Sequence, residues 1–293
     1  MDPVKSLYIL EIFYIRDTVH KYLFKLRSAG KTIGFVPTMG ALHEGHLALV
    51  ESARLQSDIV VCSIFVNPTQ FNDKSDLENY PRPIEEDIKK LEKAGCHILF
   101  MPEVDEMYNK SELWHIELGG LDTVLEGKIR PGHYQGVTQI VKKLFDTIKP
   151  DYAFFGQKDY QQFMVISYMV RVLHIPVQLI VCPIIREKDG LAMSSRNIRL
   201  SPEERIDALA LYKALTKASE LFKTKTIGQI KNEIDNFLAS AKGIEPEYFE
   251  IYDAGSFKPV NDKSAGSIIA LVAAKVGKTR IIDNMMLKLE NNS

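Results

Sequence analysis

Two histidines spaced three positions apart are the first side chains in this sequence that could do chemistry. His43 and His46 lie on a turn that also contains Gly40 and Gly45 and that follows an apolar stretch. We expect a helix from His46 to Gln56. The first turn of such a helix has unpaired backbone N–H groups and the positive end of the helix dipole. The turn could therefore bind the phosphates of a nucleotide. A metal site and two ordinary surface histidines are the open alternatives.

The common nucleotide-binding and zinc-binding motifs do not occur in the sequence. Gly30-Lys31-Thr32 and Gly277-Lys278-Thr279 resemble the end of a Walker A loop, but the glycine required five positions earlier is Lys25 or Val272. No Gly-x-Gly-x-x-Gly fingerprint is found. The histidine spacing also differs from the His-Glu-x-x-His zinc motif, so a metal would need further ligands. The histidine turn is therefore the best phosphate site in the sequence.

A second polar group, from Gly156 to Gln162, lies where an apolar strand is expected to pass into a long apolar helix. Lys158 could reach a phosphate as a positive point charge. Gln162, about one helical turn farther on, could face the same crevice. Asp159 is expected to act as the N-cap of the helix. A solvated lysine at an ordinary helix start is the alternative.

A third group combines two hydroxyls with an arginine. Ser194, Ser195 and Arg196 lie in the polar loop that runs from Lys188 to Asn197. Such a loop can give several hydrogen bonds to phosphate oxygens, and arginine gives them in a planar fork. Small polar residues with glycine are also typical of ordinary loops. The position of this loop at the start of a second domain, where it could close over the first, favours a function.

Two further segments offer polar side chains. Asn67-Pro68-Thr69-Gln70-Phe71 follows a buried strand candidate and carries neutral amides, which suit the hydroxyls and carbonyls of a substrate. Arg130-Pro131-Gly132-His133-Tyr134-Gln135-Gly136 puts an arginine and a histidine on a tight loop before a helix. For this second loop, a helix start with solvent-facing charges explains the residues as well as a ligand contact does.

Short apolar runs rich in β-branched residues alternate with amphipathic segments along the first part of the chain. This alternation predicts a parallel sheet with helices on both faces. In such sheets ligands bind beyond the carboxyl ends of the strands, where the polar groups described above are expected to converge. The expected strands are 32–36, 58–65, 97–100, 152–155 and 177–182, and the expected helices are 19–29, 46–56, 84–94, 136–148 and 159–173.

The pattern changes after Pro183. Ser201-Pro202-Glu203-Glu204 predicts a capping box at the start of a helix that runs to about residue 222. A second helix is expected at 227–239, and strands at 248–252, 267–275 and 279–287, with a tight turn at Gly277. We therefore predict a domain of residues 1–182 and a smaller α+β domain of residues 183–293. The stretch 6–14 could be a strand, a helix or a partner surface.

The composition limits the class of protein. The chain has 293 residues and a formal net charge of −1, which gives no general attraction to nucleic acid or to anionic membranes. Cys62, Cys96 and Cys182 are odd in number and have no close pair, which favours reduced thiols over a disulfide framework. Charged residues interrupt the apolar residues of the N-terminal segment, unlike a signal peptide or membrane span. We expect a cytoplasmic protein.

Five motifs, taken together and in this order, resemble those of the pantoate:β-alanine ligases, a family of the nucleotidyltransferase superfamily with His-x-Gly-His. They are residues 37–46, 65–71, 130–134, 155–159 and 193–197. The resemblance covers nearly the whole chain. It implies a Rossmann-like parallel sheet with helices on both faces, a smaller C-terminal α+β lid domain, and a homodimer.

The resemblance also implies a reaction in two steps. The carboxylate of pantoate attacks the α-phosphorus of ATP to give pantoyl adenylate and pyrophosphate, and the amine of β-alanine then displaces AMP. ATP with Mg²⁺ is therefore expected. An anion that attacks an anionic phosphate is opposed by repulsion, so the site needs donors and cations. No covalent nucleophile is needed, because the adenylate is the activated acyl group.

Carried over position by position, the resemblance implies the site residues. His46 is the position that the family treats as catalytic, and the further donors and cations are His43, Lys158, Ser194, Ser195 and Arg196. ATP contacts are expected at Met39, Gly40, His43, Gly45, His46, Gly156, Gln157, Lys158, Asp159, Ile185, Met193, Ser194, Ser195 and Arg196. Gln70 and Gln162 are expected to bind pantoate, Gln70 also near β-alanine, with Asn67, Tyr80 and Arg130 as neighbours.

One departure from the wider superfamily concerns the loop at Met193, which has Arg196 but no Lys-Met-Ser-Lys-Ser pattern. Lys158 is expected to supply the missing ammonium. Three other functions are compatible with parts of the pattern. They are a nucleotidyltransferase with a different acceptor, a nucleotide-sensing module without catalysis, and a metal-dependent hydrolase built on His43 and His46.

Overall fold

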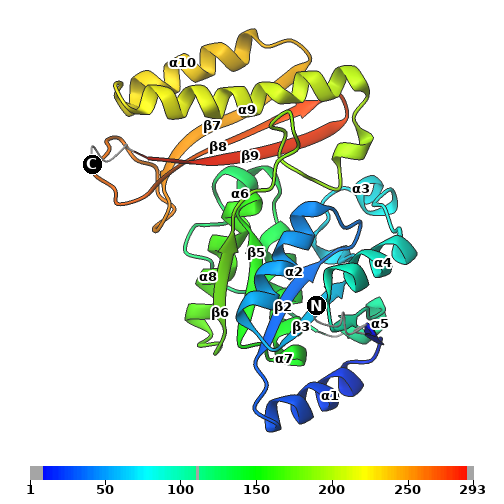
Figure 1. The fold of residues 1–293 in the computed structure, drawn as a ribbon. Helices are drawn as coiled ribbons and strands as arrows, with labels where there is room; N and C mark the ends of the chain where they lie inside the picture. Colours follow the sequence, from blue (N-terminus) through cyan, green and yellow to red (C-terminus); the bar gives the residue numbers. More distant parts are fainter. Residues whose placement is uncertain (1–8, 110–111, 289–293) are drawn as a thin grey trace, which may run out of the picture. The chain divides into compact units, whose positions relative to one another are not determined.

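The computed structural model describes residues 9–109 and 112–288, which form two compact units (Figure 1). Unit 1 contains the described residues up to Gly156 together with Gln162–Pro183. Unit 2 contains Gln157–Gln161 and the described residues from Ile184 onward. The short segment that carries Lys158 is thus part of the C-terminal unit, although it lies within the N-terminal part of the sequence.

Unit 1 is built on a six-stranded parallel sheet, which confirms the predicted architecture. The strand order is β1-β4-β3-β2-β5-β6. The strands are β1 (Glu11–Phe13), β2 (Ile33–Thr38), β3 (Ile59–Ile64), β4 (Ile98–Phe100), β5 (Tyr152–Gly156) and β6 (Gln178–Cys182). The edge strand β1 pairs with β4 and accounts for part of the stretch that the sequence left open, whose residues 6–8 lie outside the described residues.

Helices cover both faces of this sheet. Because successive side chains of a strand point to opposite faces, Val36 packs with α2 and α4 whereas Phe35 packs with α1, α7 and α8. The helices of this region are α1 (Arg16–Ser28), α2 (Glu44–Gln56), α3 (Lys74–Glu78), α4 (Ile84–Ala94), α5 (Val104–Met107), α6 (Leu125–Ile129), α7 (His133–Ile148) and α8 (Tyr160–Val172), with the 3₁₀ turn η1 (Pro68–Gln70). The 3₁₀ turn η2 (Gln157–Asp159), between β5 and α8, belongs to unit 2.

The sheet of unit 1 has a topological switch point between β2 and β5. From β2 the chain proceeds to β3 and β4 on one side, whereas from β5 it proceeds to β6 on the other side. In open α/β sheets the ligand crevice lies at such a point, beyond the carboxyl ends of the strands. The histidine turn follows β2, and Gly156 ends β5.

Unit 2 contains a three-stranded antiparallel sheet in the order β7-β8-β9. Its strands are β7 (Ile244–Asp253), β8 (Ile268–Val276) and β9 (Thr279–Leu287), and its helices are α9 (Pro202–Phe222) and α10 (Ile227–Ser240), with a 3₁₀ turn η3 (Asn197–Arg199). The two helices pack on the sheet through one apolar cluster. The predicted capping box is confirmed, since Ser201 and Glu204 exchange hydrogen bonds at 2.9 and 3.2 Å.

All three cysteines of the chain are free and buried. Burial raises the pKa of the Cys96 thiol to about 12 and also raises the pKa values of Cys62 and Cys182. These thiols are therefore protonated and unreactive at neutral pH. Within residues 9–109 and 112–288, none of the helices combines the length and the apolar composition that crossing a lipid bilayer would require.

Candidate active site

The turn between β2 and α2 starts with an unusual backbone. Gly40 and Ala41 have positive φ angles of 82° and 51°. A Cβ atom at residue 40 would lie 3.0 Å from a methyl group of Ile64 and 3.1 Å from the carboxylate of Asp87. Glycine is therefore favoured at this position by both conformation and space.

Helix α2 begins at Glu44, and His43 is its N-cap. The prediction that the helix begins at His46 was wrong by two residues, because an imidazole here replaces the short polar side chain that usually marks a helix start. His43 Nδ1 accepts a hydrogen bond from the N–H of Gly45 at 3.1 Å. In return, His46 Nδ1 accepts from the N–H of His43 at 3.4 Å.

The first turn of α2 thus uses several of the backbone N–H groups that were expected to be unpaired. Besides Gly45, the N–H groups of His46 and Leu47 donate to the carbonyl oxygen of His43, at 2.8 and 3.1 Å. If this turn binds phosphate, the hydrogen-bond donors are therefore expected to be side chains at the helix start, aided by the helix dipole, and not free backbone N–H groups.

The two capping contacts determine which ring nitrogen of each histidine carries the hydrogen. Nδ1 accepts from a backbone N–H in both His43 and His46, so the neutral form of each ring has its hydrogen on Nε2. The centroids of the two rings are 4.1 Å apart. The turn therefore carries two neighbouring imidazoles that have their hydrogen on Nε2 when neutral, an arrangement whose chemistry suits an anion.

Helix α4 holds the backbone of the histidine turn. The fully buried carboxylate of Asp87 accepts hydrogen bonds from the N–H groups of Ala41 at 2.7 Å and Leu42 at 2.8 Å. Lys90, about one turn farther along α4, donates to the carbonyl oxygen of Leu42 at 2.6 Å. Burial raises the pKa of Asp87, and the two backbone hydrogen bonds oppose that shift. Asp87 thus positions the segment that leads into His43.

Sequence reasoning missed Asp87, although the sequence contains a signal for it. Ile84, Ile88 and Leu91 form the apolar face of α4, and Asp87 lies within that face at helical spacing. A carboxylate inside a buried face needs hydrogen-bond partners, which are here the two backbone N–H groups.

A second cluster forms around the loop that follows β3. The amide of Asn67, which is 1 % exposed, donates to Oε1 of Gln70 at 3.1 Å and to the carbonyl of Gly136 at 3.2 Å. Its Oδ1 accepts from the hydroxyls of Tyr108 at 2.6 Å and Thr69 at 3.1 Å. This amide uses its full hydrogen-bonding capacity inside the protein. The structure therefore places Asn67, predicted as a neighbour of the substrate, where it orients Gln70.

Gln70 connects this loop to the histidine turn and to the loop before α7. Its Nε2 donates to the sulfur of Met39 at 2.8 Å. The backbone carbonyl oxygen of Gln70 accepts from Nδ1 of His133 at 2.7 Å and from Nη2 of Arg130 at 3.4 Å. Arg130 also donates to Nε2 of His133 at 3.1 Å, which places the hydrogen of that ring on Nδ1. The structure thus brings together Met39, Asn67, Gln70 and Arg130.

Two more predicted residues lie in unit 1 near these segments of the chain. Tyr80 is buried, and its ring packs edge-on against Phe71, the residue after Gln70, with the centroids 5.7 Å apart. Gln162 lies in the first turn of α8, shortly after the end of β5.

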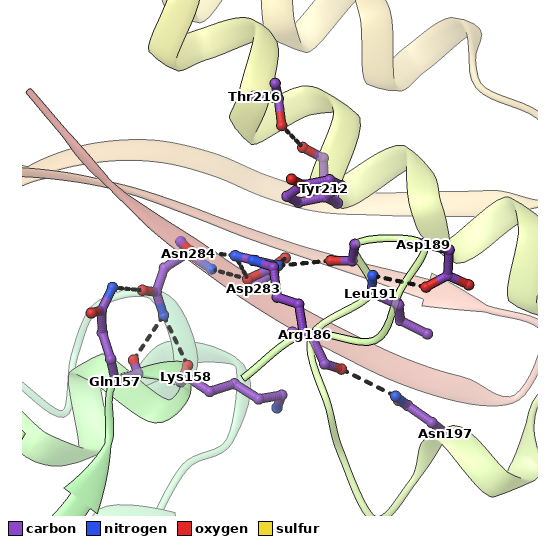
Figure 2. A network of polar contacts seen from close by, with 12 residues as sticks. Gln157, Lys158, Arg186, Asp189, Leu191, Asn197, Tyr212, Thr216, Asp283 and Asn284 are labelled. Carbon is purple, nitrogen blue, oxygen red and sulfur yellow. Dashed lines mark hydrogen bonds and ion pairs between the residues drawn. The ribbon is translucent and has the colours of Figure 1, made fainter. Parts of the chain in front are cut away.

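In unit 2, Lys158 lies on η2 between Gln157 and Asp159. The turn is attached to β9, because Nδ2 of Asn284 donates to the carbonyl oxygens of Gln157 and Lys158, both at 2.9 Å (Figure 2). Asp159, predicted as an N-cap, is the last residue of η2 and leads directly into α8.

In unit 2, the predicted residues Ile185 and Met193 are the two ends of one short ribbon, and Ser194 to Arg196 follow it directly. The N–H of Met193 donates to the carbonyl of Ile185 at 3.0 Å, so the two ends of the ribbon meet. Ser194 Oγ then accepts from the N–H of Arg196 at 3.3 Å, which closes a tight turn around Ser195. Unit 2 therefore contains the ribbon as well as Lys158.

The chain is similar over nearly its whole length to known proteins. The family model of pantoate-beta-alanine ligase matches residues 11–286. The pantothenate synthetase of Thermotoga neapolitana is 49% identical over 273 residues, which cover 92% of this chain and 97% of that protein.

Solved structures show the same fold. The crystal structure of pantothenate synthetase from Thermus thermophilus has a TM-score of 0.89 at 39% identity and covers 94% of this chain and 99% of its own. The pantoate-beta-alanine ligase of Francisella tularensis, complexed with beta-gamma ATP and beta-alanine, has a TM-score of 0.79 at 33% identity, with 95% and 98% covered. By sequence, length and fold, the chain belongs to the pantoate–β-alanine ligase (pantothenate synthetase) family.

Proposed function

We propose that the protein joins pantoate to β-alanine at the expense of ATP, through a pantoyl adenylate. The overall ligation, which forms pantothenate, is the reaction for which its family is named. In the first step the carboxylate of pantoate bonds to the α-phosphorus of ATP, and pyrophosphate leaves. In the second step the amine of β-alanine bonds to the acyl carbon, AMP leaves, and the amine gives up a proton.

The observation that carries this proposal is the pair of Nε2–H donors on the histidine turn. One anion attacks another in the first step, so catalysis requires donors aimed at the negative charge that builds up around phosphorus. His43 and His46 have such donors because their Nδ1 atoms accept from the backbone. They also lie at the positive end of α2, after the switch-point strand β2.

Two cations of unit 2 are proposed as further ATP contacts. Lys158 is proposed to neutralise phosphate charge as a compact ammonium, and Arg196 as a planar fork beside the hydroxyls of Ser194 and Ser195. The further contacts that we propose are Met39, Gly40, Gly45, Gly156, Gln157, Asp159, Ile185 and Met193.

Mg²⁺ is proposed to enter as part of the substrate MgATP. Among the residues that the structure describes, no group of three or more His, Cys, Asp or Glu side chains is placed to hold a metal ion. Mg²⁺ binds nucleotides through their phosphate oxygens and keeps several of its waters. When bound, it would neutralise part of the phosphate charge, beside the side chains named above.

Pantoate is proposed to bind at Gln70 and Gln162, with β-alanine near Gln70. The Nε2 donor of Gln70 is directed at the sulfur of Met39, 2.8 Å away. A thioether is a weak acceptor, so an oxygen of pantoate can replace it while Asn67 still holds the other end of the amide. Arg130 is proposed to act through the Gln70 backbone, and Tyr80 through its packing on Phe71.

We also propose that the protein works in the cytoplasm, as its composition and N-terminal segment suggest, and that it forms the homodimer that the motif resemblance implies. Its free thiols suit a reducing compartment.

The proposal is tested by exchange of labelled pyrophosphate into ATP in the absence of β-alanine. Adenylate formation is reversible, so we expect exchange that requires both pantoate and Mg²⁺. Addition of β-alanine should then produce pantothenate and AMP in equal amounts. Exchange that does not need pantoate would indicate a different acceptor, and the lack of any exchange would indicate a binding module. Inhibition by chelators that Mg²⁺ cannot reverse would indicate a zinc hydrolase.

The role of Asp87 in holding the histidine turn leads to a second expectation. Asp87→Asn should lower the kcat for pantothenate formation about 10-fold, because the amide can accept from only one of the two N–H groups and turns a donor toward the other. Glu92→Gln, an exposed position on the same helix, is the matched control and should leave the rate unchanged. Steady-state kinetics on both variants measure the effect, and equal rates would show that Asp87 does not position the turn.

A further inference from the structure

The side chain of Asn284 on β9 makes three hydrogen bonds to the turn that carries Lys158. Its Oδ1 accepts from Nε2 of Gln157 at 3.0 Å. Its Nδ2 donates to the carbonyl oxygens of Gln157 and Lys158, each at 2.9 Å. Asn284 is 1 % exposed, and all three hydrogen bonds involve its side-chain amide (Figure 2).

The chemistry of these contacts requires an amide at position 284. Both partners of Nδ2 are carbonyl oxygens, which can only accept, so the amide cannot be flipped without placing Oδ1 against two acceptors. A carboxylate of the same size would repel both carbonyls. The backbone of Gln157 and Lys158 is thereby fixed from a strand that lies more than a hundred positions later in the sequence.

The preceding residue of β9, Asp283, holds the second segment of unit 2 that is proposed to bind ATP. Asp283 accepts two hydrogen bonds from Arg186, at 2.6 and 3.0 Å. Arg186 also donates to the carbonyl of Asn284 at 3.1 Å, and its guanidinium lies 4.7 Å from the centre of the Tyr212 ring. Arg186 belongs to the ribbon whose ends are Ile185 and Met193. Successive residues of one strand thus hold the ribbon and the lysine turn, as Figure 2 shows.

We propose that Asn284 is a positioning residue for Lys158, and that Asp283 and Asn284 together carry the lysine turn and the Met193 ribbon as one rigid piece. The inference rests on the proposed function, in which both segments act on the phosphates of ATP. A lysine side chain is long and flexible, so the fixed backbone at its base sets the region that its ammonium can reach. Displacing a reacting or stabilising group by about 1 Å can cost on the order of 100-fold in rate.

The test uses pantoate-dependent exchange of pyrophosphate into ATP by the full-length protein. We expect Asn284→Ala to lower kcat for exchange at least ~10-fold, and Asn284→Asp to lower it further, because the carboxylate repels the two carbonyls. The KM for pantoate should stay within about 2-fold of the wild-type value, since Gln70 and Gln162 belong to unit 1. Asn236→Ala, an exposed amide on α10 of the same unit, is the matched control and should exchange normally.

A double-variant comparison separates positioning from a general structural role. If Asn284 acts through Lys158, adding Asn284→Ala to Lys158→Ala should lower exchange by less than about 2-fold further. Circular dichroism and thermal unfolding identify variants that fail to fold; if Asn284→Asp is one of them, Asn284→Ala decides. Losses that multiply in the double variant, or wild-type exchange by Asn284→Ala, would overturn the inference. A wild-type protein without exchange would instead overturn the proposed function, and this inference with it.

Discussion

Replacing His46 by alanine is expected to lower the rate of pantoyl-adenylate formation at least ~100-fold, the scale on which a single donor to a transition state acts. The expected loss is large because the substitution removes two things at once. It removes the Nε2–H donor, and it removes the Nδ1 acceptor that fixes the N–H of the capping residue His43. Single-turnover measurement of pyrophosphate release, with pantoate and without β-alanine, isolates this step.

Two amides separate the functions of the two ring nitrogens of His46. Glutamine can place a donor near the position of Nε2, whereas asparagine can replace only the acceptor at Nδ1. We therefore expect His46→Gln to retain more activity than His46→Asn. His115→Ala, a substitution of an exposed histidine paired with Glu117, serves as the control and should leave the rate unchanged. Near wild-type pyrophosphate release by folded His46→Ala would remove this residue from the mechanism.

Replacing Lys158 by alanine is also expected to lower adenylate formation at least ~100-fold. The ammonium is proposed to balance charge on the phosphates, and Arg196 has a different shape and cannot take its place as a point charge. The loss should fall on pyrophosphate release. The second step, measured with preformed pantoyl adenylate and β-alanine, should be affected far less because pyrophosphate has already left.

The matched control for Lys158 is Lys142→Ala, which removes a lysine that pairs with Asp146 on the surface of α7. This variant should show wild-type rates in both steps. Equal losses in the two steps for Lys158→Ala would contradict the proposed role in charge balance. A comparison of the His46 and Lys158 variants in the same assay shows how much each residue contributes to the rate of adenylate formation.

The sheet and its helices could be predicted from the sequence because their signals are local. Period-two alternation puts Phe35 and Val36 on opposite faces of β2, and the capping box at Ser201 marks the start of α9. The motifs at the ends of strands were equally visible, since glycines and polar residues follow apolar runs there. The start of α2 was misplaced because a histidine acts as its N-cap, a use of this residue that helix-start preferences do not anticipate.

The partners of the supporting residues could not be predicted, because they are distant in the sequence. Asp87 contacts backbone N–H groups some forty-five positions earlier in the chain. Asn284 directly follows Asp283 in β9, and no local pattern of that strand indicates which backbone groups its amide will bind. Such contacts depend on backbone groups, which every residue has, and the sequence alone does not show which of them will meet a given side chain.

The placement of Gln157–Gln161 in unit 2 has a consequence for dissecting the protein. A fragment that starts at Ile184 would contain the whole antiparallel sheet and both of its helices, yet it would lack the lysine turn to which the Asn284 amide bonds. Conversely, a fragment that ends at Pro183 would keep the lysine turn but lose the strand that shapes it. A cut between Pro183 and Ile184 would therefore separate the lysine turn from the strand that its backbone is bonded to, and an exchange of unit 2 between relatives would have to include residues 157–161 as well.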